Sequence, residues 1–464
     1  MYNKIDSIVL GKLQEIVGKD FVFTDKETID IFSKDETENY SFPPELVIKP
    51  SNAEEISAIL QIANEYMIPV IPRGGGTGLS GGALPVMGGI SLSLERMNKI
   101  LEIDENNFQA IVQPGVITQV FQEELESKGL FYPVDPASRG SCFIGGNIAE
   151  CSGGPRAAKY GTTKDYVLGL QFVSAEGDII DAGARTLKNV TGYNLSQLIT
   201  GSEGTLGIVT KIIFKILSLP KYKKVILIAF GSVENCITSV AEFYKSGIIP
   251  SALEFLTKDA VKAAEAHLGK PFPNSDAEAQ LLVELDGNNE TVINEEIEKI
   301  AELAEKFGAT DIILAEERQK MDDLWALRRS VGEAVKAIST YKEEDTVVPR
   351  YKLPELAKGI KEISEKFGLT IIFYGHAGDG NLHVNILKKD LTEEVWKNLV
   401  DKAIREIFTL TVSLGGMISG EHGIGYSQKK YLPIALGKKQ IELMKQIKKV
   451  FDPNNILNPG KIFP

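Results

Sequence analysis

Histidines and one glutamate are concentrated in two short glycine-rich motifs in the second half of the chain. YGHAGDGNLHVNI contains His376 and His383, and GEHGIG contains Glu421 and His422. Two imidazole nitrogens and a carboxylate oxygen suit a catalytic divalent metal with an open coordination position, so His376, His383 and Glu421 are candidate ligands. Because histidine titrates near neutral pH, His422 is a candidate general base. Spacing alone leaves open whether these side chains meet, and the alternative is a hydrogen-bonded histidine cluster without a metal.

An arginine interrupts the apolar face of a helix predicted over residues 322–338. This face consists of residues three or four positions apart, namely Leu324, Leu327, Val331, Val335 and Ile338. Arg328 falls inside the face, whereas Arg329 points away from it. A charge on a buried face needs a partner. Arg328 is therefore predicted either to bind a substrate carboxylate or to form an interdomain ion pair.

Three glycine-rich stretches have compositions that suit phosphate binding. PRGGGTGLSGG begins at Pro72, DPASRGSCFIGGNIAECSGGPRAAKYGTTKDYV at Asp135 and GSEGTLGIVT at Gly201. Glycines let consecutive backbone N–H groups converge on an anion, and two separated turns can hold one extended dinucleotide. Alone, the first stretch is also compatible with a mobile loop. It matches neither a GxGxxG turn leading into a helix nor a P-loop, so a Rossmann or NTPase fold fits poorly.

The elements before the first glycine-rich stretch predict a strand–helix–strand unit. ELVIKP reads as a strand, Asn52 caps an amphipathic helix that runs to about Met67, and IPVIP reads as the next strand. VLGLQFVSAEGDIIDAG reads as a hairpin that turns at residues 176–178. The first glycine-rich turn is therefore predicted at the end of a strand.

Beyond a polar joint at residues 220–224, predicted strands alternate with charged helices, as in an α+β domain. The period of two along the strand after His376 places His383 and Asn385 on one face. The last stretch, from about residue 404, is mostly helical. At 464 residues the chain is long enough for two domains or more.

The three glycine-rich stretches, in this order, resemble the FAD-binding domain of the vanillyl-alcohol oxidase / p-cresol methylhydroxylase (PCMH) flavoprotein family. The resemblance extends over nearly the whole chain to the glycolate oxidase subunit and D-lactate dehydrogenase branch. It implies an α+β protein with a two-subdomain PCMH-type FAD-binding domain over 1–222. A ferredoxin-like substrate cap domain would span 223–405, and a helical C-terminal segment over 406–464 would return to the active site.

The resemblance also implies where FAD binds. The residues expected at the pyrophosphate are Arg73, Gly74, Gly75, Gly76, Thr77, Gly78 and Leu79. Those expected along the isoalloxazine and ribityl chain are Ser141, Gly145, Gly146, Asn147, Ser152, Gly153 and Gly154. Glu203, Gly204 and Ile208 are expected at the adenosine half.

The activity implied by the resemblance is oxidation of a small D-2-hydroxy acid to the 2-keto acid. D-lactate is the first candidate substrate, and glycolate or D-2-hydroxyglutarate come next. Enzymes of this branch carry the same motifs around a divalent metal, which implies ligation by His376, His383 and Glu421 and a base role for His422. Zinc, iron and manganese all suit this ligand set. The base would take the hydroxyl proton while the α-hydrogen leaves as hydride for the flavin.

Two cationic residues are implied to bind the substrate. The resemblance places a carboxylate-binding arginine at Arg328 and a lysine further along the chain, for which Lys342 is the closest match. The EEDTVVP segment after Lys342 departs in length from the 2-hydroxyglutarate enzymes.

Histidine and cysteine positions bear on how FAD is held and where its electrons go. All four histidines lie beyond residue 222, which excludes histidyl attachment within the FAD domain and predicts non-covalent FAD. Three cysteines, Cys142, Cys151 and Cys236, are too few for a four-cysteine iron–sulfur cluster. Electrons are therefore predicted to pass to an electron-transfer flavoprotein, an iron–sulfur subunit, a quinone or oxygen. The sequence also allows a homodimer.

Charge and hydropathy restrict the other partners. A net charge of −12 and a pI near 5.2 provide no general attraction for nucleic acid or anionic lipid. No apolar run approaches the roughly 20 residues that span a bilayer, and the expected location is the cytoplasm. Two alternatives remain, a non-catalytic FAD-holding subunit of a larger oxidase complex and a non-redox flavoprotein similar to ether-lipid synthases. The retained histidines and glutamate disfavour the first, and the acidic chain disfavours the second.

Overall fold

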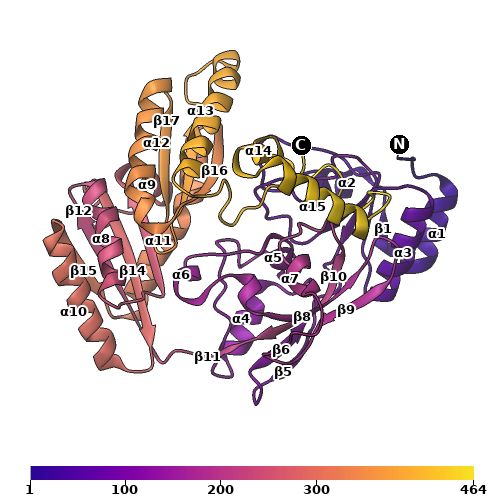
Figure 1. The fold of residues 1–464 in the computed structure, drawn as a ribbon, viewed down its shortest axis with the longest axis horizontal. Helices are drawn as coiled ribbons and strands as arrows, with labels where there is room; N and C mark the ends of the chain where they lie inside the picture. Colours follow the sequence, from indigo (N-terminus) through magenta and orange to yellow (C-terminus); the bar gives the residue numbers. More distant parts are fainter. Residues whose placement is uncertain (1) are drawn as a thin grey trace. The chain divides into compact units, whose positions relative to one another are not determined.

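The computed structural model describes residues 2–464, which form two compact units (Figure 1). Unit 1 comprises the chain up to Gly153, Thr162–Leu219 and Glu421–Pro464. Unit 2 comprises Gly154–Gly161 and Pro220–Gly420. The second segment of unit 1 ends at Leu219, close to the predicted joint at 220–224. The predicted boundary near 405 falls inside a helix, α13 (Glu393–Ser413).

The first sheet of unit 1 contains the predicted strand–helix–strand unit. Its order is β1-β2-β4-β3, with β1 at Val22–Phe23, β2 at Leu46–Ile48, β4 at Ile90–Ser93 and β3 at Val70–Arg73. The predicted helix is α3 (Ala53–Glu65), and the Asn52 side chain accepts a hydrogen bond from the Glu55 N–H, which confirms the predicted cap. β2, β4 and β3 run parallel, so the first glycine-rich stretch leaves the carboxyl end of β3, where α/β sheets commonly bind ligands.

The second sheet of unit 1 is antiparallel in the order β5-β6-β10-β8-β9. Its strands are Ile100–Asp104, Gln109–Val112, Ile208–Lys215, Val167–Val173 and Ile179–Gly183. β8 and β9 form the predicted hairpin, and its turn lies between Val173 and Ile179. The third glycine-rich stretch leads directly into β10, so it is anchored by this sheet.

Short strands and helices complete unit 1. β7 (Leu130–Phe131) pairs with β11 (Leu217–Ser218). The remaining helices of four or more residues are α1 (Ser7–Val17), α2 (Lys26–Phe32), α4 (Thr118–Glu126), α5 (Ile144–Glu150), α7 (Leu195–Ile199), α14 (Leu432–Ala435) and α15 (Lys438–Phe451). Leu457 bridges to Val70 in β3, so the C-terminal segment covers the outer edge of the first sheet.

Unit 2 is built on a seven-stranded antiparallel sheet in the order β15-β12-β14-β13-β17-β18-β16. The strands are Ala309–Ala315, Tyr222–Phe230, Ala279–Gly287, Ala252–Thr257, Thr370–His376, Asn381–Leu387 and Tyr341–Val347. Helices α9 (Lys258–Leu268) and α11 (Arg318–Lys336) share a hydrophobic core with one face of the sheet. Helices α8 (Val233–Lys245), α10 (Glu290–Lys306), α12 (Leu353–Phe367) and α13 pack with one another along the sheet (Figure 1), and α6 (Ala157–Tyr160) contacts β13.

The predicted apolar face at 322–338 is confirmed except at its end. Leu324, Leu327, Val331 and Val335 are buried, and so is Arg328, whereas Arg329 is exposed as predicted. The prediction for Ile338 is wrong, since this side chain is 44% exposed. Helix α11 ends at Lys336, so the helical periodicity that would place Ile338 on the apolar face does not extend to it.

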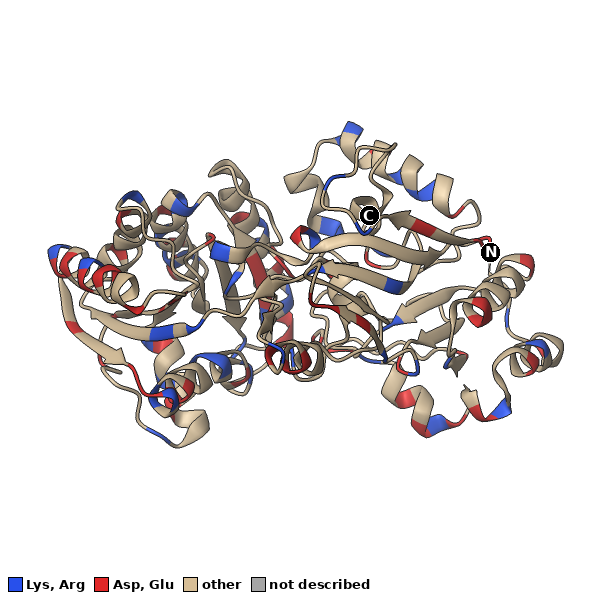
Figure 2. Ribbon diagram, turned by 90° about the horizontal axis from the view of Figure 1, so that it is seen from below, with Lys and Arg blue, Asp and Glu red and all other residues tan. Residues whose placement is uncertain are grey.

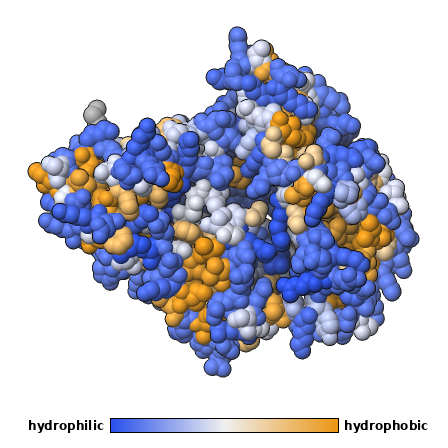
Figure 3. All heavy atoms as spheres, turned by 180° about the vertical axis from the view of Figure 1, so that it is seen from behind, coloured by the Kyte–Doolittle hydropathy of each residue, from blue (hydrophilic) through white to orange (hydrophobic). Residues whose placement is uncertain are grey.

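Surface charges and apolar side chains are both dispersed. Acidic and basic residues are interspersed along the helices in Figure 2. Apolar side chains on the face in Figure 3 gather in separate patches on a largely hydrophilic surface. Among the helices described within residues 2–464, none has the length and hydropathy needed to cross a membrane.

Candidate functional site

Unit 1 contains a cavity lined by all three glycine-rich stretches, with about 1320 Å³ of non-atom space. We call it the glycine cavity. Most residues predicted to contact FAD line it, namely Arg73, Gly74, Gly75, Gly76, Thr77, Gly78, Leu79, Gly145, Gly146, Asn147, Ser152, Gly153, Glu203, Gly204 and Ile208. The lining comes from three segments that are far apart in the sequence, as a site that holds an extended dinucleotide from several sides would require.

Two predicted FAD contacts are absent from the lining. Ser141 lies behind the first glycine-rich stretch, because a Cβ on Gly75 would come within 2.5 Å of the Ser141 carbonyl oxygen. Gly154 belongs to unit 2 rather than to the unit that forms the cavity. The close approach at Gly75 explains why the first stretch needs glycine there, since any side chain would displace the backbone at Ser141.

The sequence did not predict several lining residues. Phe143, Glu150 and Ser202 line the cavity, and so do Glu421 and His422. A Cβ on Gly153 would lie 2.9 Å from Glu421 Oε2, so Glu421 sits against the second glycine-rich stretch. The candidate base His422 and its neighbour therefore border the same cavity as the predicted FAD contacts, although they are far from them in sequence.

Arg73 provides a buried cation at the glycine cavity. Its guanidinium packs over the Phe32 ring at 5.0 Å. Burial lowers the pKa of Arg73, against the opposing effect of the nearby Asp35 carboxylate. Arg73 Nη1 is buried and has no hydrogen-bond partner within residues 2–464. A pyrophosphate oxygen would satisfy this donor, so the residues present fit the predicted ligand.

A cluster of buried charges holds the loop that carries His422. Glu203 accepts hydrogen bonds from the backbone N–H groups of Ile424 at 2.9 Å and Gly425 at 2.7 Å. Lys461 Nζ donates to the carbonyl oxygens of Gly81, Gly82 and Leu84 at 2.6–3.1 Å. The third glycine-rich stretch is thus bonded to the His422 loop, and the C-terminus is bonded to the first stretch.

Burial shifts the protonation of this cluster. It raises the pKa of Glu203, although the two backbone donors oppose the shift. Burial and the neighbouring Glu203 and Asp35 carboxylates raise the pKa of Glu150 well above its ordinary value. Burial lowers the pKa of Lys461 to about 7. Sequence patterns gave no sign of Lys461, because its partners are backbone carbonyls almost 400 residues earlier in the chain.

In unit 2, His376 and His383 face each other from adjacent strands. His376 ends β17 and His383 lies on β18, and both side chains are buried. Their Nε2 atoms are 3.4 Å apart, and the ring planes are almost perpendicular at 88°. Two nitrogens bound to one tetrahedral metal at 2.0–2.1 Å would be separated by about 3.3 Å. The spacing of the two histidines therefore fits two ligands of one ion.

Glu254 on β13 orients His376. Its carboxylate oxygens lie 2.7 and 3.0 Å from His376 Nδ1. With the Nδ1 proton donated to Glu254, the Nε2 atom of neutral His376 presents a lone pair toward His383. Metal-binding histidines are commonly held in this way by a carboxylate. Sequence analysis missed Glu254, because nothing in ALEFLT distinguishes it from an ordinary strand residue.

Arg328 on α11 forms an ion pair with the same glutamate. Arg328 Nη2 lies 2.5 Å from Glu254 Oε2. Burial alone would raise the pKa of Glu254, but the charge of Arg328 and the hydrogen bond from His376 outweigh it and hold this pKa below its ordinary value. Of the two predicted partners for Arg328, the structure contains an ion pair, and it lies within unit 2 rather than between domains. A substrate-binding role for Arg328 stays a prediction.

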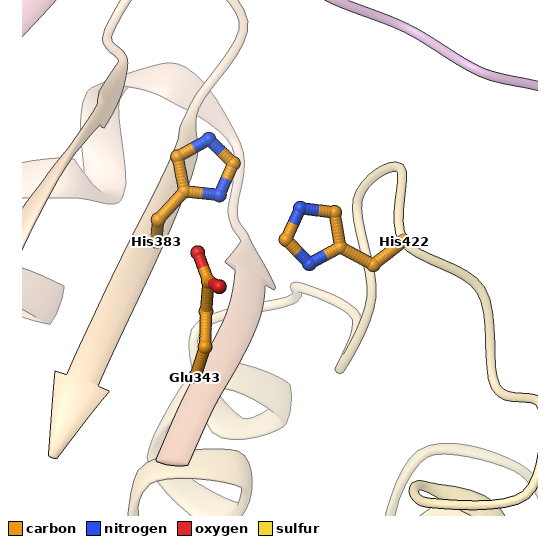
Figure 4. Close-up of side chains that lie close together, drawn as sticks. All are labelled: Glu343, His383 and His422. Atoms are coloured by element: carbon orange, nitrogen blue, oxygen red, sulfur yellow. The ribbon is translucent and has the colours of Figure 1, made fainter. Parts of the chain in front are cut away.

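The side chain that β16 presents beside the histidines is Glu343, not Lys342. Asp345 pairs with His383 and Glu343 with Asn385, so Glu343 and His383 lie on the same face, whereas Lys342 pairs with Ile386 on the other face. Figure 4 shows Glu343 and His383 on neighbouring strands, and it also draws His422. The register places Lys342 on the face opposite His383, and a substrate-binding role for Lys342 stays a prediction.

The lysine that reaches this face comes from α11. Lys336 Nζ lies 2.9 Å from Glu343 Oε2 and 5.6 Å from the centre of the Tyr341 ring. Burial opposes the charged form of Lys336, but the Glu343 carboxylate raises the pKa of Lys336 above its ordinary value. A carboxylate oxygen of Glu343 and a ring nitrogen of His383 lie within 4.8 Å of each other. Sequence patterns do not predict this pair, because no apolar alternation in YKEEDTVV identifies the inward face of the strand.

The last residues of unit 2 are bonded to the strand beside the histidines. The Gly420 N–H donates to Asp345 Oδ2 at 2.8 Å, and the Ser419 hydroxyl donates to the same oxygen at 3.0 Å. Asp345 is the cross-strand partner of His383. Glu421 is the next residue in the chain, and neighbouring Cα atoms are about 3.8 Å apart. The chain thus leaves unit 2 for Glu421 and His422 from a point fixed next to His383.

Comparison with known proteins adds to this description. The family model of the FAD linked oxidases, C-terminal domain, matches residues 219–462, and that of an FAD binding domain matches residues 44–183. The glycolate oxidase subunit GlcD of Bacillus subtilis (strain 168) is 44% identical, over 93% of this chain and 92% of its own. The D-lactate dehydrogenase of Anaerostipes hadrus is 38% identical, over 99% of this chain and 98% of its own.

Solved structures confirm the predicted fold class. The structure of p-cresol methylhydroxylase with substrate bound has a TM-score of 0.82 at 20% identity, over 98% of this chain and 96% of that chain. At this identity the likeness concerns the fold alone. The mixed α and β architecture of the PCMH type, predicted from the glycine-rich stretches, is confirmed.

Proposed function

Because the chain belongs to the family of FAD-linked oxidases, we propose that it oxidises a small D-2-hydroxy acid to the corresponding 2-keto acid. D-lactate is the first candidate substrate, followed by glycolate and D-2-hydroxyglutarate. The observation that carries this proposal is the facing pair of buried histidines, His376 and His383, with Glu254 behind one of them. A plain FAD-binding module has no need of such a pair.

A divalent metal held by His376, His383 and Glu421 completes the proposal. Two Nε2 atoms at 3.4 Å repel each other unless a proton or a cation lies between them. The histidine–carboxylate bond to Glu254 orients His376 in the way that metal ligands require. Gly420 is fixed beside His383, which restricts where Glu421 begins. The metal would polarise the substrate hydroxyl, and zinc, iron or manganese would each suit the donors.

His422 is the proposed base. It lines the glycine cavity together with Glu421, so its imidazole borders the space in which the family's cofactor binds. His422 would accept the hydroxyl proton of the substrate as the carbonyl forms. FAD, when bound, supplies the acceptor for the α-hydrogen, which leaves as a hydride with both electrons of the C–H bond.

The reduced cofactor then requires an external electron acceptor. The cysteines Cys142, Cys151 and Cys236 are dispersed, and none of the three is paired. The relative from Bacillus subtilis is named as a subunit, which supports transfer to a partner protein. We propose an electron-transfer flavoprotein, an iron–sulfur subunit or a quinone as the acceptor, with FAD bound non-covalently.

Anaerobic mixing of the purified protein with hydroxy acids tests the proposed function. We expect D-lactate, or glycolate, to bleach the flavin absorbance, and L-lactate to leave it unchanged. Acid precipitation of the same sample should release all FAD into the supernatant. If none of the D- or L-2-hydroxy acids reduces the flavin in metal-loaded protein, the proposed function is wrong.

A further inference from the structure

We infer that the Glu343–Lys336 ion pair makes this site selective for 2-hydroxy acids with a single carboxylate. The inference rests on the proposed function and narrows its substrate class to compounds such as D-lactate and glycolate. It concerns unit 2 alone, where Glu343 stands on the histidine-bearing face of the sheet (Figure 4).

Glu343 lies on β16 opposite Asn385, two positions before Asp345, which is the cross-strand partner of His383. It is on the same face as His383, and the two side chains approach within 4.8 Å. Only 5% of the Glu343 side chain is exposed. A substrate whose hydroxyl is near His383 would therefore have Glu343 among its nearest protein groups. A substituent on the α-carbon that extends along β16 meets a buried carboxylate.

Helix α11 directs two cations at this face, and both already have a carboxylate partner. Arg328 pairs with Glu254 at 2.5 Å, and Lys336 pairs with Glu343 at 2.9 Å. The two cations are eight positions apart, which is about two helical turns, so they lie along the same side of α11. Both cations are therefore already compensated by a protein carboxylate before any substrate binds.

Because both cations are already paired, a substrate with two carboxylates should bind less favourably than a substrate with one. The carboxylate beside the hydroxyl can bind near the proposed metal, which brings positive charge of its own. A second carboxylate has no uncompensated cation on α11 to bind. To reach Lys336 it would have to displace Glu343, which would then be a buried charge without its partner. The neutral side chain of lactate, or the hydrogen of glycolate, carries no such cost.

The neutral side chains of this face support the same conclusion. Lys336 packs over the Tyr341 ring, and Tyr341 lies on the same face as Glu343. Tyr374 and Ile372 are on this face of β17 and are buried. The ion pair thus lies among these rings and Asn385, the cross-strand partner of Glu343. Burial here strengthens a charge–charge interaction and also increases the penalty for an extra charge.

Glu343→Gln tests the inference, because it removes the carboxylate while preserving shape and frees Lys336 for a second substrate carboxylate. The measurement is anaerobic flavin reduction in holoenzyme with D-lactate and with D-2-hydroxyglutarate. We expect Glu343→Gln to raise the ratio of kcat/KM for D-2-hydroxyglutarate to that for D-lactate by at least about tenfold, the factor that corresponds to 1.4 kcal/mol. Adding Lys336→Met to Glu343→Gln should reverse this gain.

Glu333→Gln is a matched control on the same helix. Glu333 is exposed, and its substitution removes the same charge from the chain without touching the face that bears His383. The substrate ratio should stay at the wild-type value. An unchanged ratio in Glu343→Gln, or a gain that persists in the double variant, would overturn the inference.

A second measurement needs no variant and separates charge from size. The wild-type holoenzyme is mixed with D-2-hydroxyglutarate and with its 5-amide, which has the same length but no second charge. The amide should reduce the flavin at least about tenfold more efficiently, and equal efficiency would overturn the inference. If D-lactate reduces the flavin while these ratios fail, only the selectivity is wrong. If no hydroxy acid reduces it, the proposed function itself fails.

Discussion

The two units build their candidate sites from different parts of the polypeptide. The glycine cavity of unit 1 is lined by many glycines, which leave backbone open to a ligand, as at Gly75, where no Cβ fits against Ser141. The histidine-bearing face of unit 2 is made of side chains, with each cation of α11 paired to a carboxylate. The glycine-lined part of the cavity, here called the backbone cradle, is disrupted by adding atoms. The histidine-bearing face, here called the side-chain site, is disrupted by removing a charge or a proton acceptor.

The largest expected effect comes from His422, the proposed base, which lines the glycine cavity of unit 1. His422→Asn keeps a polar group and removes the proposed proton acceptor. Flavin reduction by D-lactate should slow by roughly 10²–10⁴-fold, the usual range for loss of a general base. Rapid-mixing absorbance gives the rate, and elemental analysis gives the metal content.

The metal content of the same variant separates two roles of His422. Retained metal with slow reduction supports the base. Metal lost together with activity would identify His422 as a ligand, and near-normal reduction with metal retained would remove the base from the mechanism.

Arg328→Met tests the dependence of unit 2 on compensated charge. It leaves Glu254 buried without its guanidinium partner, and breaking such a pair costs about 3–5 kcal/mol. The thermal unfolding midpoint should fall markedly. Arg329→Met is the matched control, because Arg329 is exposed on the same helix and its loss should leave the midpoint near wild type. Equal effects of the two substitutions would contradict the ion pair.

Gly75→Ala tests the backbone cradle of unit 1. The added Cβ would lie 2.5 Å from the Ser141 carbonyl oxygen, and overpacking of this kind costs about 1–3 kcal/mol. We expect less FAD in the purified protein, measured by absorbance after acid release. Gly11→Ala makes the same change on helix α1, where a Cβ meets nothing within 4 Å. Normal FAD content in Gly75→Ala would show that the cradle tolerates side chains.

Lys461 should produce the smallest effect at neutral pH, and one that grows as the pH rises. Burial lowers the pKa of Lys461 to about 7, below the roughly 10.4 of an unfolded lysine. Between these values the unfolded chain binds more protons, so this residue's contribution to stability grows as the pH rises from 7 toward 10 and is lost as the pH falls through 7. Lys461→Met should flatten the rise of the unfolding midpoint over this window.

The shape of that pH profile decides the role of Lys461. A variant that is less stable by the same amount at every pH would show that Lys461 acts only through its bonds to Gly81, Gly82 and Leu84. A profile that converges with wild type near pH 7 would support the titration.

Local patterns were sufficient to predict much of the frame. The cap at Asn52, the hairpin at 176–178 and the burial of Arg328 follow from periodicity within short windows, and all three are present. The common face of His383 and Asn385 is present as well, since a period of two requires only that the strand exist.

The rest of the site depends on contacts between distant segments, which periodicity does not encode. Glu254 reaches His376 across 122 positions. Lys342 is implied only by the family resemblance, and the strand YKEEDTVV lacks the apolar alternation that would identify Glu343 on its inward face. Lys461 acts on backbone carbonyls, which have no signature in the sequence.

Removal of the metal tests the central claim most directly. The claim is that flavin reduction requires the proposed metal ligands of the side-chain site, whereas FAD binding requires only the backbone cradle. The protein is dialysed against a chelator, analysed for metal and FAD, and mixed anaerobically with D-lactate. We predict that the flavin stays bound, that it is no longer bleached, and that zinc, manganese or ferrous iron restores bleaching. Full bleaching by protein shown to contain no metal would contradict the assignment of His376, His383 and Glu421.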